Sequence, residues 1–329
     1  MIELNINLAN DIYYQDAYAA LYADSDGEVF DFVYEQGENR ITFRAIKRRI
    51  MNVAGIAIDE ELYDLETPYG YGGPSSNCYD DTFLTAAFQA YRVECAKQRI
   101  VCEFIRFHPF NQMLEHSSYF DFFCQERQVV IVDLTLVQES RWSKYSKTTR
   151  NILRKANKKL SRSCSPDDLD TFLNLYQQTM DKNQAADFYY FDRPYFTQLA
   201  NIYGVELLSV KLDDEIVSMG FFMQTGELAH YHLSANNSDL LKENGNYALL
   251  DFAFERAQQN GCKLMMLGGG RTSAEDDSLF KFKTKFSDQV KPFFIAGIDF
   301  LPEKRAWLNE IWLQQHSNDS RKMFQLYRA

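Results

Sequence analysis

The sequence lacks the features that mark several common classes of protein. None of its 329 residues falls in an apolar run near the ~18 consecutive residues that a membrane-spanning helix requires. Its start, MIELNINLAND, lacks the basic and then apolar layout of a secretion signal. We therefore expect a cytoplasmic protein with no integral membrane segment.

Metal-binding and disulfide patterns are missing as well. The six cysteines are scattered, with no C-x-x-C pair and no histidines at a matching spacing. His230 and His232 stand two apart on an expected strand, hence on one face of it, but no third ligand follows at a suitable spacing. We expect reduced cysteines, no metal, and a core or cleft role for the two histidines.

Two frequent catalytic signatures are also missing. The sequence contains no G-x-S-x-G, which marks many serine hydrolases, and no G-x-x-x-x-G-K-[ST], the phosphate loop of nucleotide hydrolases. Neither class is supported.

Positive charge is scarce overall but concentrated in one segment. The net charge of −11 argues against a protein that covers nucleic acid over its whole surface. Residues 141–165, however, contain nine Lys and Arg and no acidic residue. The spacing predicts a basic helix over 141–162, whose outward stripe includes Arg150 and Arg154. This stripe is either a solvated surface or an anion-binding one.

The order of elements predicts an α+β protein, with mixed α/β sheets, in two similar halves. The first half reads as a hairpin (27–48), a Gly- and Pro-rich loop (64–76), a helix (80–97) and a strand (99–107). The second reads as two helices (165–180 and 192–202), a three-stranded meander (205–235), a helix (245–259) and a strand (262–267). The similarity indicates an internal duplication, although many α+β proteins contain such an order.

The C-terminal segment should pack back on the first half. Trp307, Leu308, Ile311 and Trp312 share one face of an expected helix. We therefore assign residues 1–138 and 302–329 to a first domain, and 139–301 to a second, catalytic domain introduced by the basic helix.

The stretch MMLGGGRTSAEDDSLFKFKTKFS, residues 265–287, carries the first candidate site. Gly268–Gly270 follow an apolar strand, so backbone could approach a ligand there without side-chain obstruction, and Arg271 comes next. Asp277 or Ser278 could cap the segment after the loop. We expect residues 278–286 to be a strand that brings a lysine beside an acyl oxygen or a phosphate. Solvent exposure is the alternative for these lysines.

A second candidate is the entry to the helix at 245–259. Asn244, Gly245 and Asn246 are small or polar, and helix N-terminal amides bind pyrophosphate or carboxylate groups. An ordinary helix cap explains the same residues.

Five motifs stand out along the chain: PYGYGGP (68–74), IRFHPFN (105–111), SKTTRNILRKA (146–156), NGNYALLDFA (244–253) and LGGGRTSAEDDSLFKFKTKFS (267–287). Together they resemble the FemAB-like branch of the GNAT acyltransferase superfamily, over nearly the whole chain. The resemblance implies two tandem GNAT-like domains, with the C-terminal helix on the first. It also implies an N-acyltransferase that acts on an amine of a cell-envelope precursor, either peptidoglycan or polysaccharide.

The resemblance also suggests roles for individual residues. Phe282-Lys283 looks like the family's F-K pair, in which the lysine stabilises the reacting group, and Arg271 looks like the adjoining wall. His232, with His108 and Asp277 as alternatives, is a candidate general base, and deprotonation assisted by the substrate is equally possible. The implied substrate-binding residues, which would line a cleft between the domains, are Tyr69, Tyr71, Gly72, Gly73, Arg106, His108, Tyr231, Gly269, Gly270 and Phe282. The implied donor-binding residues are Lys242, Asn244, Gly245, Asn246, Tyr247, Arg150 and Arg154.

The acyl donor stays open between aminoacyl-tRNA and acetyl-coenzyme A, and we expect no tightly bound cofactor. The turn KENGNYA departs from the superfamily's Q/R-x-x-G-x-G/A because its second glycine is replaced. For tRNA, the link between 184 and 204 is too short for the helical arm of some family members, and only the basic helix could supply phosphate contacts. A lipid-linked precursor would bring the protein to a membrane surface peripherally. The alternatives are an acetyl-coenzyme A-dependent N-acetyltransferase of a small amino substrate and a non-catalytic module that binds an anionic ligand.

Overall fold

The computed structural model describes residues 6–23, 27–182, 184, 190–274, 276–316 and 323–329. The chain divides into two compact units. Unit 1 comprises Met1–Ile12 and Arg127–Lys291, and unit 2 comprises Tyr13–Glu126 and Pro292–Ala329. The chain passes between them within strands β8 (Phe122–Asp133) and β14 (Val290–Asp299). Both crossings precede the domain boundaries expected at 138 and 301.

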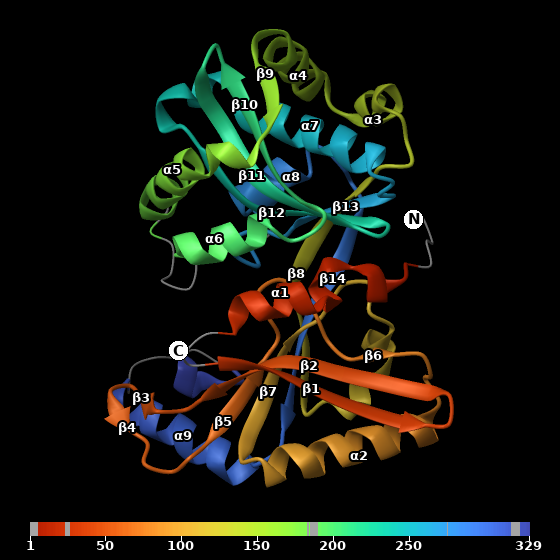
Figure 1. The fold of residues 1–329 in the computed structure, drawn as a ribbon, viewed down its shortest axis with the longest axis vertical. Coiled ribbons are helices and arrows are strands. Elements are labelled where there is room, and N and C mark those ends of the chain that lie inside the picture. Colours follow the sequence, from red (N-terminus) through yellow and green to blue (C-terminus); the bar gives the residue numbers. More distant parts are fainter. Residues whose placement is uncertain (1–5, 24–26, 183, 185–189, 275, 317–322) are drawn as a thin grey trace. The chain divides into compact units, whose positions relative to one another are not determined.

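Unit 1 is built on a mixed sheet in the order β8-β13-β12-β11-β10-β9 (Figure 1). Its meander is formed by β10 (Val205–Leu212), β11 (Glu215–Thr225) and β12 (Leu228–Asn236), which pair antiparallel as the three runs separated by tight turns predict. Strand β9 (Ser161–Cys164) pairs antiparallel with β10, and β13 (Leu264–Gly268) runs parallel to β12 and antiparallel to β8.

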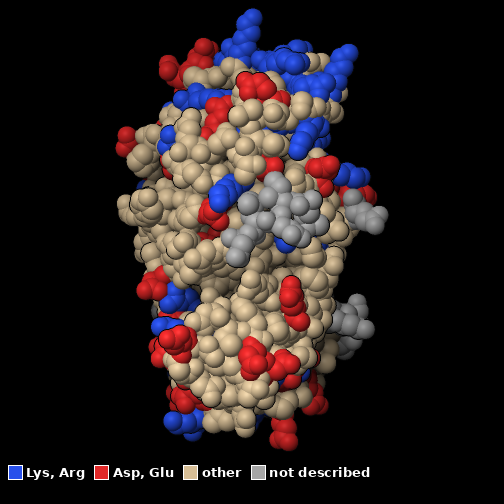
Figure 2. Space-filling model, turned by 90° about the vertical axis from the view of Figure 1, so that its right-hand side faces the viewer, with Lys and Arg blue, Asp and Glu red and all other residues tan. Residues whose placement is uncertain are grey.

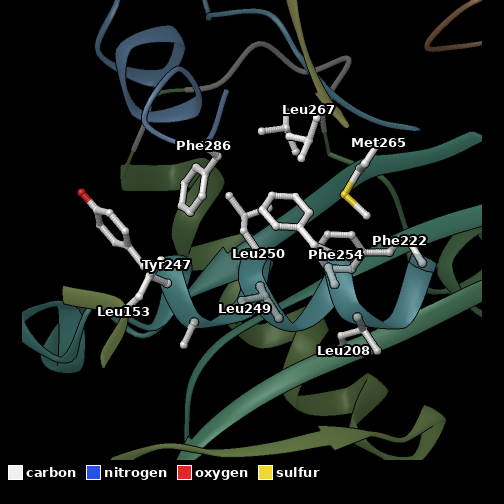
Figure 3. Close-up of a cluster of buried hydrophobic side chains, with 14 of the residues drawn as sticks. Leu153, Leu208, Phe222, Tyr247, Leu249, Leu250, Phe254, Met265, Leu267 and Phe286 are labelled. Atoms are coloured by element: carbon white, nitrogen blue, oxygen red, sulfur yellow. The ribbon is translucent and has the colours of Figure 1, made fainter. Parts of the chain in front are cut away.

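Helices cover both faces of this sheet (Figure 1). One face carries α5 (Leu169–Lys182) and α6 (Arg193–Ala200), and the other carries α3 (Gln138–Lys144), α4 (Lys147–Lys159) and α7 (Gly245–Gln259). Figure 3 shows the core around α7, where Leu250, Phe254 and Phe286 meet. Buried Asp251 accepts from Trp142 Nε1 at 2.7 Å and Asn157 Nδ2 at 2.8 Å, and so fastens α3 and α4 to α7.

Unit 2 contains strands in the order β1-β2-β5-β7-β14. The hairpin of β1 (Gly27–Gln36) and β2 (Asn39–Arg49) is confirmed, followed by β5 (Tyr63–Glu66) and β7 (Ile100–Arg106). Helix α2 (Asp81–Lys97) starts where expected, because the Asp80 carboxylate accepts from the amides of Thr82 and Phe83. Helix α9 (Pro302–Gln315) packs on the opposite side through Leu308 and Trp312.

Short elements complete the fold. They are β3 (Asn52–Val53), β4 (Ile56–Ala57), β6 (Ser75–Ser76), α1 (Asp16–Ala19), α8 (Ser278–Lys283) and the 3₁₀ turns η1 (Leu8–Asn10), η2 (Ile12–Tyr14), η3 (Ala20–Tyr22), η4 (Gln112–Tyr119), η5 (Pro166–Asp168), η7 (Ser238–Glu243) and η8 (Leu326–Arg328).

The mixed α/β fold and the return of the C-terminal helix to the first sheet are confirmed. One residue of the apolar face expected for α9 is not buried. Trp307 is 40% exposed, whereas Trp312 is 1% exposed. A helix of this length covers its sheet with a narrow stripe, and Trp307 lies at the edge of it.

Two local expectations were wrong. Residues 278–283 form helix α8 rather than a strand, because the Asp277 side chain accepts from the Phe280 amide and caps the segment. The single basic helix over 141–162 is two helices, because Ser146 caps the Thr149 amide and starts α4 anew. The β11–β12 register shifts at His232, and His230 stays close enough to His232 to contribute to its lowered pKa.

Candidate active site

The end of strand β13 presents glycine backbone, as its sequence predicted. Gly268 has a φ of +75°, in the region that glycine reaches without strain. A Cβ on Gly269 would lie 2.7 Å from Arg127 Cδ, and one on Gly270 would lie 2.4 Å from an Asp277 carboxylate oxygen. The Gly270 carbonyl accepts from Arg127 Nη1 at 2.7 Å. The glycines are therefore needed for close approach to Arg127 and Asp277.

Asp277 organises the loop that leads from this strand end to α8. Its carboxylate accepts from the backbone amides of Arg271 at 3.0 Å, Thr272 at 3.1 Å and Phe280 at 2.9 Å. Partial burial favours the neutral acid, but these hydrogen bonds outweigh it and lower the Asp277 pKa. Asp277 is therefore a fixed anion, and the Arg271 side chain lies at the surface.

Lys283 is the charged side chain that the fold buries at this place. It is only 7% exposed, and its Nζ donates to the Gly269 carbonyl at 2.7 Å. The Nζ also lies 5.8 Å from the centre of the Tyr231 ring. Burial lowers the Lys283 pKa to about 7, while the Asp277 charge raises it and Arg127 lowers it. Lys283 therefore lies beside the end of β13 formed by Gly268–Gly270 (the glycine strand end), as predicted, but it is carried by a helix.

The sheet opens beside Lys283. In the described part of the chain, the parallel pairing of β12 and β13 ends at His230 and Met266, although β12 continues to Asn236. His232 is the extra residue of the β12 bulge, and its Nε2 lies 2.9 Å from the Tyr195 hydroxyl. Burial lowers the His232 pKa to about 3, with a smaller contribution from His230. A neutral imidazole with that pKa is a weak proton acceptor.

The turn before α7 has the conformation of a helix entry. Asn244 adopts the left-handed region at φ 57°, and its side chain donates to the Lys242 carbonyl at 2.8 Å instead of capping the helix. Gly245 is buried, and a Cβ there would lie 2.6 Å from Val217. Asn246 is half-buried and Lys242 is exposed. Tyr247 is buried, and its hydroxyl accepts from Lys285 Nζ at 2.8 Å.

The basic stripe of α4 is exposed in part. Lys147, Arg154 and Lys158 face solvent, and Figure 2 shows Lys and Arg side chains gathered at the upper end of the view, where Figure 1 places α4. Arg150 is half-buried, and its Nη1 donates to the Tyr145 carbonyl at 2.5 Å. Arg150 therefore holds the α3–α4 turn as well as contributing charge.

The candidate residues of unit 2 form a cluster of their own. Tyr71 lies edge-on to the His108 ring at 5.6 Å and to the Tyr13 ring at 5.3 Å. The Gly72 amide donates to the Arg106 carbonyl at 2.7 Å, and the His108 amide donates to the Gly72 carbonyl at 2.9 Å. These backbone bonds attach the glycine-rich loop to the strand end that carries Arg106 and His108.

The remaining members of this cluster are held by structural contacts. Arg106 pairs with Glu66 at 2.5 Å, and the Tyr69 carbonyl accepts from the Tyr18 hydroxyl at 2.7 Å. Gly73 has a φ of +97°, and a Cβ there would lie 2.8 Å from the Phe107 ring. Glycine is required at this position for both reasons.

Phe282, the neighbour of Lys283, packs away from the glycine strand end. Its ring meets Tyr247 edge-on at 5.2 Å and Phe286 at 5.5 Å. It therefore joins α8 to the turn before α7.

Sequence reasoning missed Arg127, Tyr195 and Asp11. Arg127 binds Gly270, Tyr195 binds His232, and the Asp11 carboxylate lies 2.6 Å from His230 Nε2 in a buried pair. All three come from elements far along the chain, so no local motif pointed to them.

This geometry agrees with a comparison against protein families. Residues 144–283 match the model of the acetyltransferase (GNAT) domain. This segment contains the meander, the opened strands, the α7 turn and Lys283. Residues 144–283 therefore resemble a GNAT-type acetyltransferase domain, and the match supports an acyltransferase enzyme, as expected.

Several solved structures share the fold of the chain. The chain resembles the crystal structure of FemX, with 12% identity and a TM-score of 0.64 over 88% of this chain and 92% of that one. It also resembles the C-terminal domain of a putative lysylphosphatidylglycerol synthetase from Agrobacterium fabrum, with 16% identity and a TM-score of 0.58 over 92% and 93%. L-PGS from Bacillus licheniformis follows, with 14% identity and a TM-score of 0.51 over 88% of each chain.

No curated protein sequence matches the chain. Among the described residues, no helix combines the length and apolarity needed to traverse a bilayer.

Proposed function

We propose that this protein is an N-acyltransferase that transfers an aminoacyl or acyl group to an amine of a cell-envelope precursor. The observation that carries the proposal is Lys283, a buried lysine held by a glycine carbonyl beside opened strands in a GNAT-type domain. The resemblance to the FemAB-like branch favours peptidoglycan or polysaccharide as the acceptor. A neighbour named for lysylphosphatidylglycerol synthesis adds support for an envelope component.

The chemistry requires a stabilised oxyanion. When an amine attacks an activated carbonyl, the carbonyl oxygen becomes negative in the tetrahedral intermediate. The Lys283 ammonium, in a poorly solvated position, interacts with such a charge much more strongly than a surface lysine does. Because Gly269 already orients its Nζ, little reorganisation is needed as the charge develops.

Proton removal from the attacking amine has no strong base among the candidates in unit 1. His232 has a pKa of about 3, and the Asp277 carboxylate already accepts from several amides. We therefore favour an acceptor amine that arrives neutral or loses its proton with the help of the substrate.

The opened edge of β12 suits an extended donor. Beyond His230 the strand has no partner in β13, so its backbone groups can pair with amides of a bound chain. Coenzyme A and a peptide both provide such amides. The α7 turn offers helix amides for a pyrophosphate, and the exposed cations of α4 offer phosphate contacts for tRNA.

A transfer assay with both donors tests the proposal. The protein is incubated with labelled acetyl-coenzyme A or charged tRNA, and with a peptidoglycan precursor peptide or an amino sugar. We expect transfer from one donor, and a loss of about 100-fold or more in kcat for Lys283→Ala. Lys281→Ala is the matched control, because Lys281 is exposed on the same helix, and it should retain activity within about twofold.

The donor is identified by salt dependence. If charged tRNA is the donor, its affinity should fall steeply with salt, and Arg154→Gln should reduce the slope of log K against log salt by about 1. Binding without transfer from either donor would favour the non-catalytic anion-binding module. If the protein neither binds a donor nor transfers from one, both the enzyme and the binding-module proposals are refuted.

A further inference from the structure

The junction between α3 and α4 borders a pocket that is separate from the Lys283 centre. The cavity measures 590 Å³. Its walls come from the end of β8, from the α3–α4 junction and from residues 284–289, which follow α8. None of the glycines of β13, Lys283 or the residues of the α7 turn line it.

Arg141 lines this pocket, and part of its guanidinium group has no hydrogen-bond partner among the described residues. The side chain is 2% exposed, and its Nη1 donates to the Leu136 carbonyl at 2.5 Å and to Gln258 at 3.2 Å. Nε and Nη2 have no hydrogen-bond partner among the described residues. These two nitrogens form the edge of the guanidinium that binds two oxygens of one oxyanion side by side. Leaving charged donors buried without an acceptor is unfavourable, so the edge is suited to a ligand.

Tyr145 supplies a second buried donor. Its side chain is 5% exposed, and its hydroxyl has no hydrogen-bond partner in the part of the chain that the structure describes. Burial raises the Tyr145 pKa, as does Asp251, while the charge and the N–H groups of the neighbouring Arg141, which lie outside hydrogen-bond geometry, oppose the change. The hydroxyl therefore keeps its proton at neutral pH and can donate it to an anion.

The N-terminus of α4 faces the same pocket. Ser146 and Thr149 are both lining residues, and Ser146 Oγ accepts from the Thr149 amide at 3.1 Å. The other amides of the first turn have no acceptor within the helix, and they carry the positive end of the dipole of a 13-residue helix.

Three cations, one of them Arg141, and two carboxylates line the pocket. Exposed Lys144 and Lys285 line it. Two carboxylates also line it, but Asp133 accepts from the Thr135 amide at 2.9 Å and hydroxyl at 2.6 Å, and Asp288 lies at the surface.

We propose that this pocket binds a phosphate group, with the Arg141 edge and the Tyr145 hydroxyl as buried contacts and Lys144 at the entrance. A tetrahedral phosphate offers enough oxygens for the guanidinium, the hydroxyl and the helix amides together, whereas a carboxylate offers two. The volume leaves room for more than one phosphate group, so a diphosphate or a small phosphorylated metabolite fits the site.

Calorimetric titration of the full-length protein with inorganic pyrophosphate, and separately with orthophosphate, tests the proposal at constant ionic strength. We expect one saturable site. Tyr145→Phe keeps the ring that packs edge-on to Phe286, and it should weaken binding at least fivefold. Lys144→Gln should weaken it severalfold. Lys155→Gln removes the same charge from an exposed position of α4 outside the pocket, and it should change affinity less than twofold.

Two results would refute the proposed phosphate site. One is no saturable binding at millimolar pyrophosphate, and the other is equal weakening by Lys144→Gln and Lys155→Gln, which would indicate general surface attraction. Binding of orthophosphate as tight as that of pyrophosphate would assign the site to a single phosphate group. Lys283→Ala should leave pyrophosphate binding intact while it abolishes transfer, so failure of the proposed enzyme and failure of this site are distinguishable.

Discussion

Replacing Lys283 by methionine should make the protein more stable at neutral pH. It should also remove the contribution of this lysine to the pH dependence of the free energy of unfolding. Methionine keeps most of the side-chain volume and removes the charge that burial penalises. The ordinary lysine pKa of 10.5 applies in the unfolded chain, and burial lowers the pKa of Lys283 to about 7 in the folded chain.

The magnitude follows from the proton balance. Between pH 7 and 10.5 the unfolded chain binds a proton at Lys283 that the folded chain has released, so stability rises with pH by about 1.4 kcal/mol per pH unit. Below pH 7 both states carry the proton, and the folded state bears the whole cost of the buried ammonium, on the order of 5 kcal/mol. At neutral pH most of that cost remains, and it disappears as the pH approaches 10.5.

Urea unfolding at pH 7, 8 and 9 measures the contribution of Lys283 as the difference in the free energy of unfolding between wild type and Lys283→Met. The advantage of the variant should shrink by roughly 2 to 3 kcal/mol over this range. Lys281→Met, on the exposed side of α8, should show a difference that does not change with pH. If the wild-type and Lys283→Met curves stayed parallel, the lysine would be solvated in the folded chain, and the argument for an oxyanion role would lose its basis.

Two further predictions concern the surroundings of Lys283 and the C-terminal helix. Asp277→Asn removes the charge that raises the Lys283 pKa, so that pKa should fall below its wild-type value, as followed by NMR of isotope-labelled lysine side chains. Trp312→Ala should destabilise the protein by about 3 to 5 kcal/mol in urea unfolding, because its side chain is 1% exposed in the core under α9. Trp307→Ala, on the same helix but 40% exposed, should cost clearly less, and equal losses would show that α9 is held differently.

The sequence predicted the elements whose local signals agree with one another. The meander consists of three runs rich in apolar residues that are separated by the short turns preceding β11 and β12, so composition and turn signals point to the same strands. The helices expected from residues 80 and 165 start there, because the Asp80 and Ser165 side chains accept from amides of the first turn. The position of Lys283 near the glycine strand end was also predictable, because both lie in one short stretch of chain.

The errors arose where two patterns compete. In residues 278–286, Phe282 and Phe286 satisfy a helical spacing of four, while the Phe/Lys alternation satisfies a strand. The Asp277 cap decides for the helix. The same logic applies to the basic segment, where Ser146 precedes Thr149 by the spacing of an N-cap and divides one expected helix into two.

The burial of a particular lysine could not be read from the sequence. Lys281, Lys283 and Lys285 have similar local surroundings in the chain, yet Lys283 is buried and the other two are exposed. The difference comes from the orientation of α8 against β12 and β13. Partners such as Arg127 and Tyr195 are also set by tertiary contacts, which leave no mark at those positions in the sequence.

The burial that destabilises Lys283 is also what suits it to the proposed reaction. A surface lysine is stabilised by water before any substrate arrives, so it gains little when a negative charge forms nearby. Lys283 has lost most of that water, and the Gly269 carbonyl replaces only one of the three hydrogen bonds that an ammonium can donate. An oxyanion at the glycine strand end would supply a partner of opposite charge, so the interaction would be stronger in the transition state than in the resting protein. Mutational loss of one such donor in other enzymes lowers kcat by about 100- to 1,000-fold, and this is the range expected for Lys283→Ala.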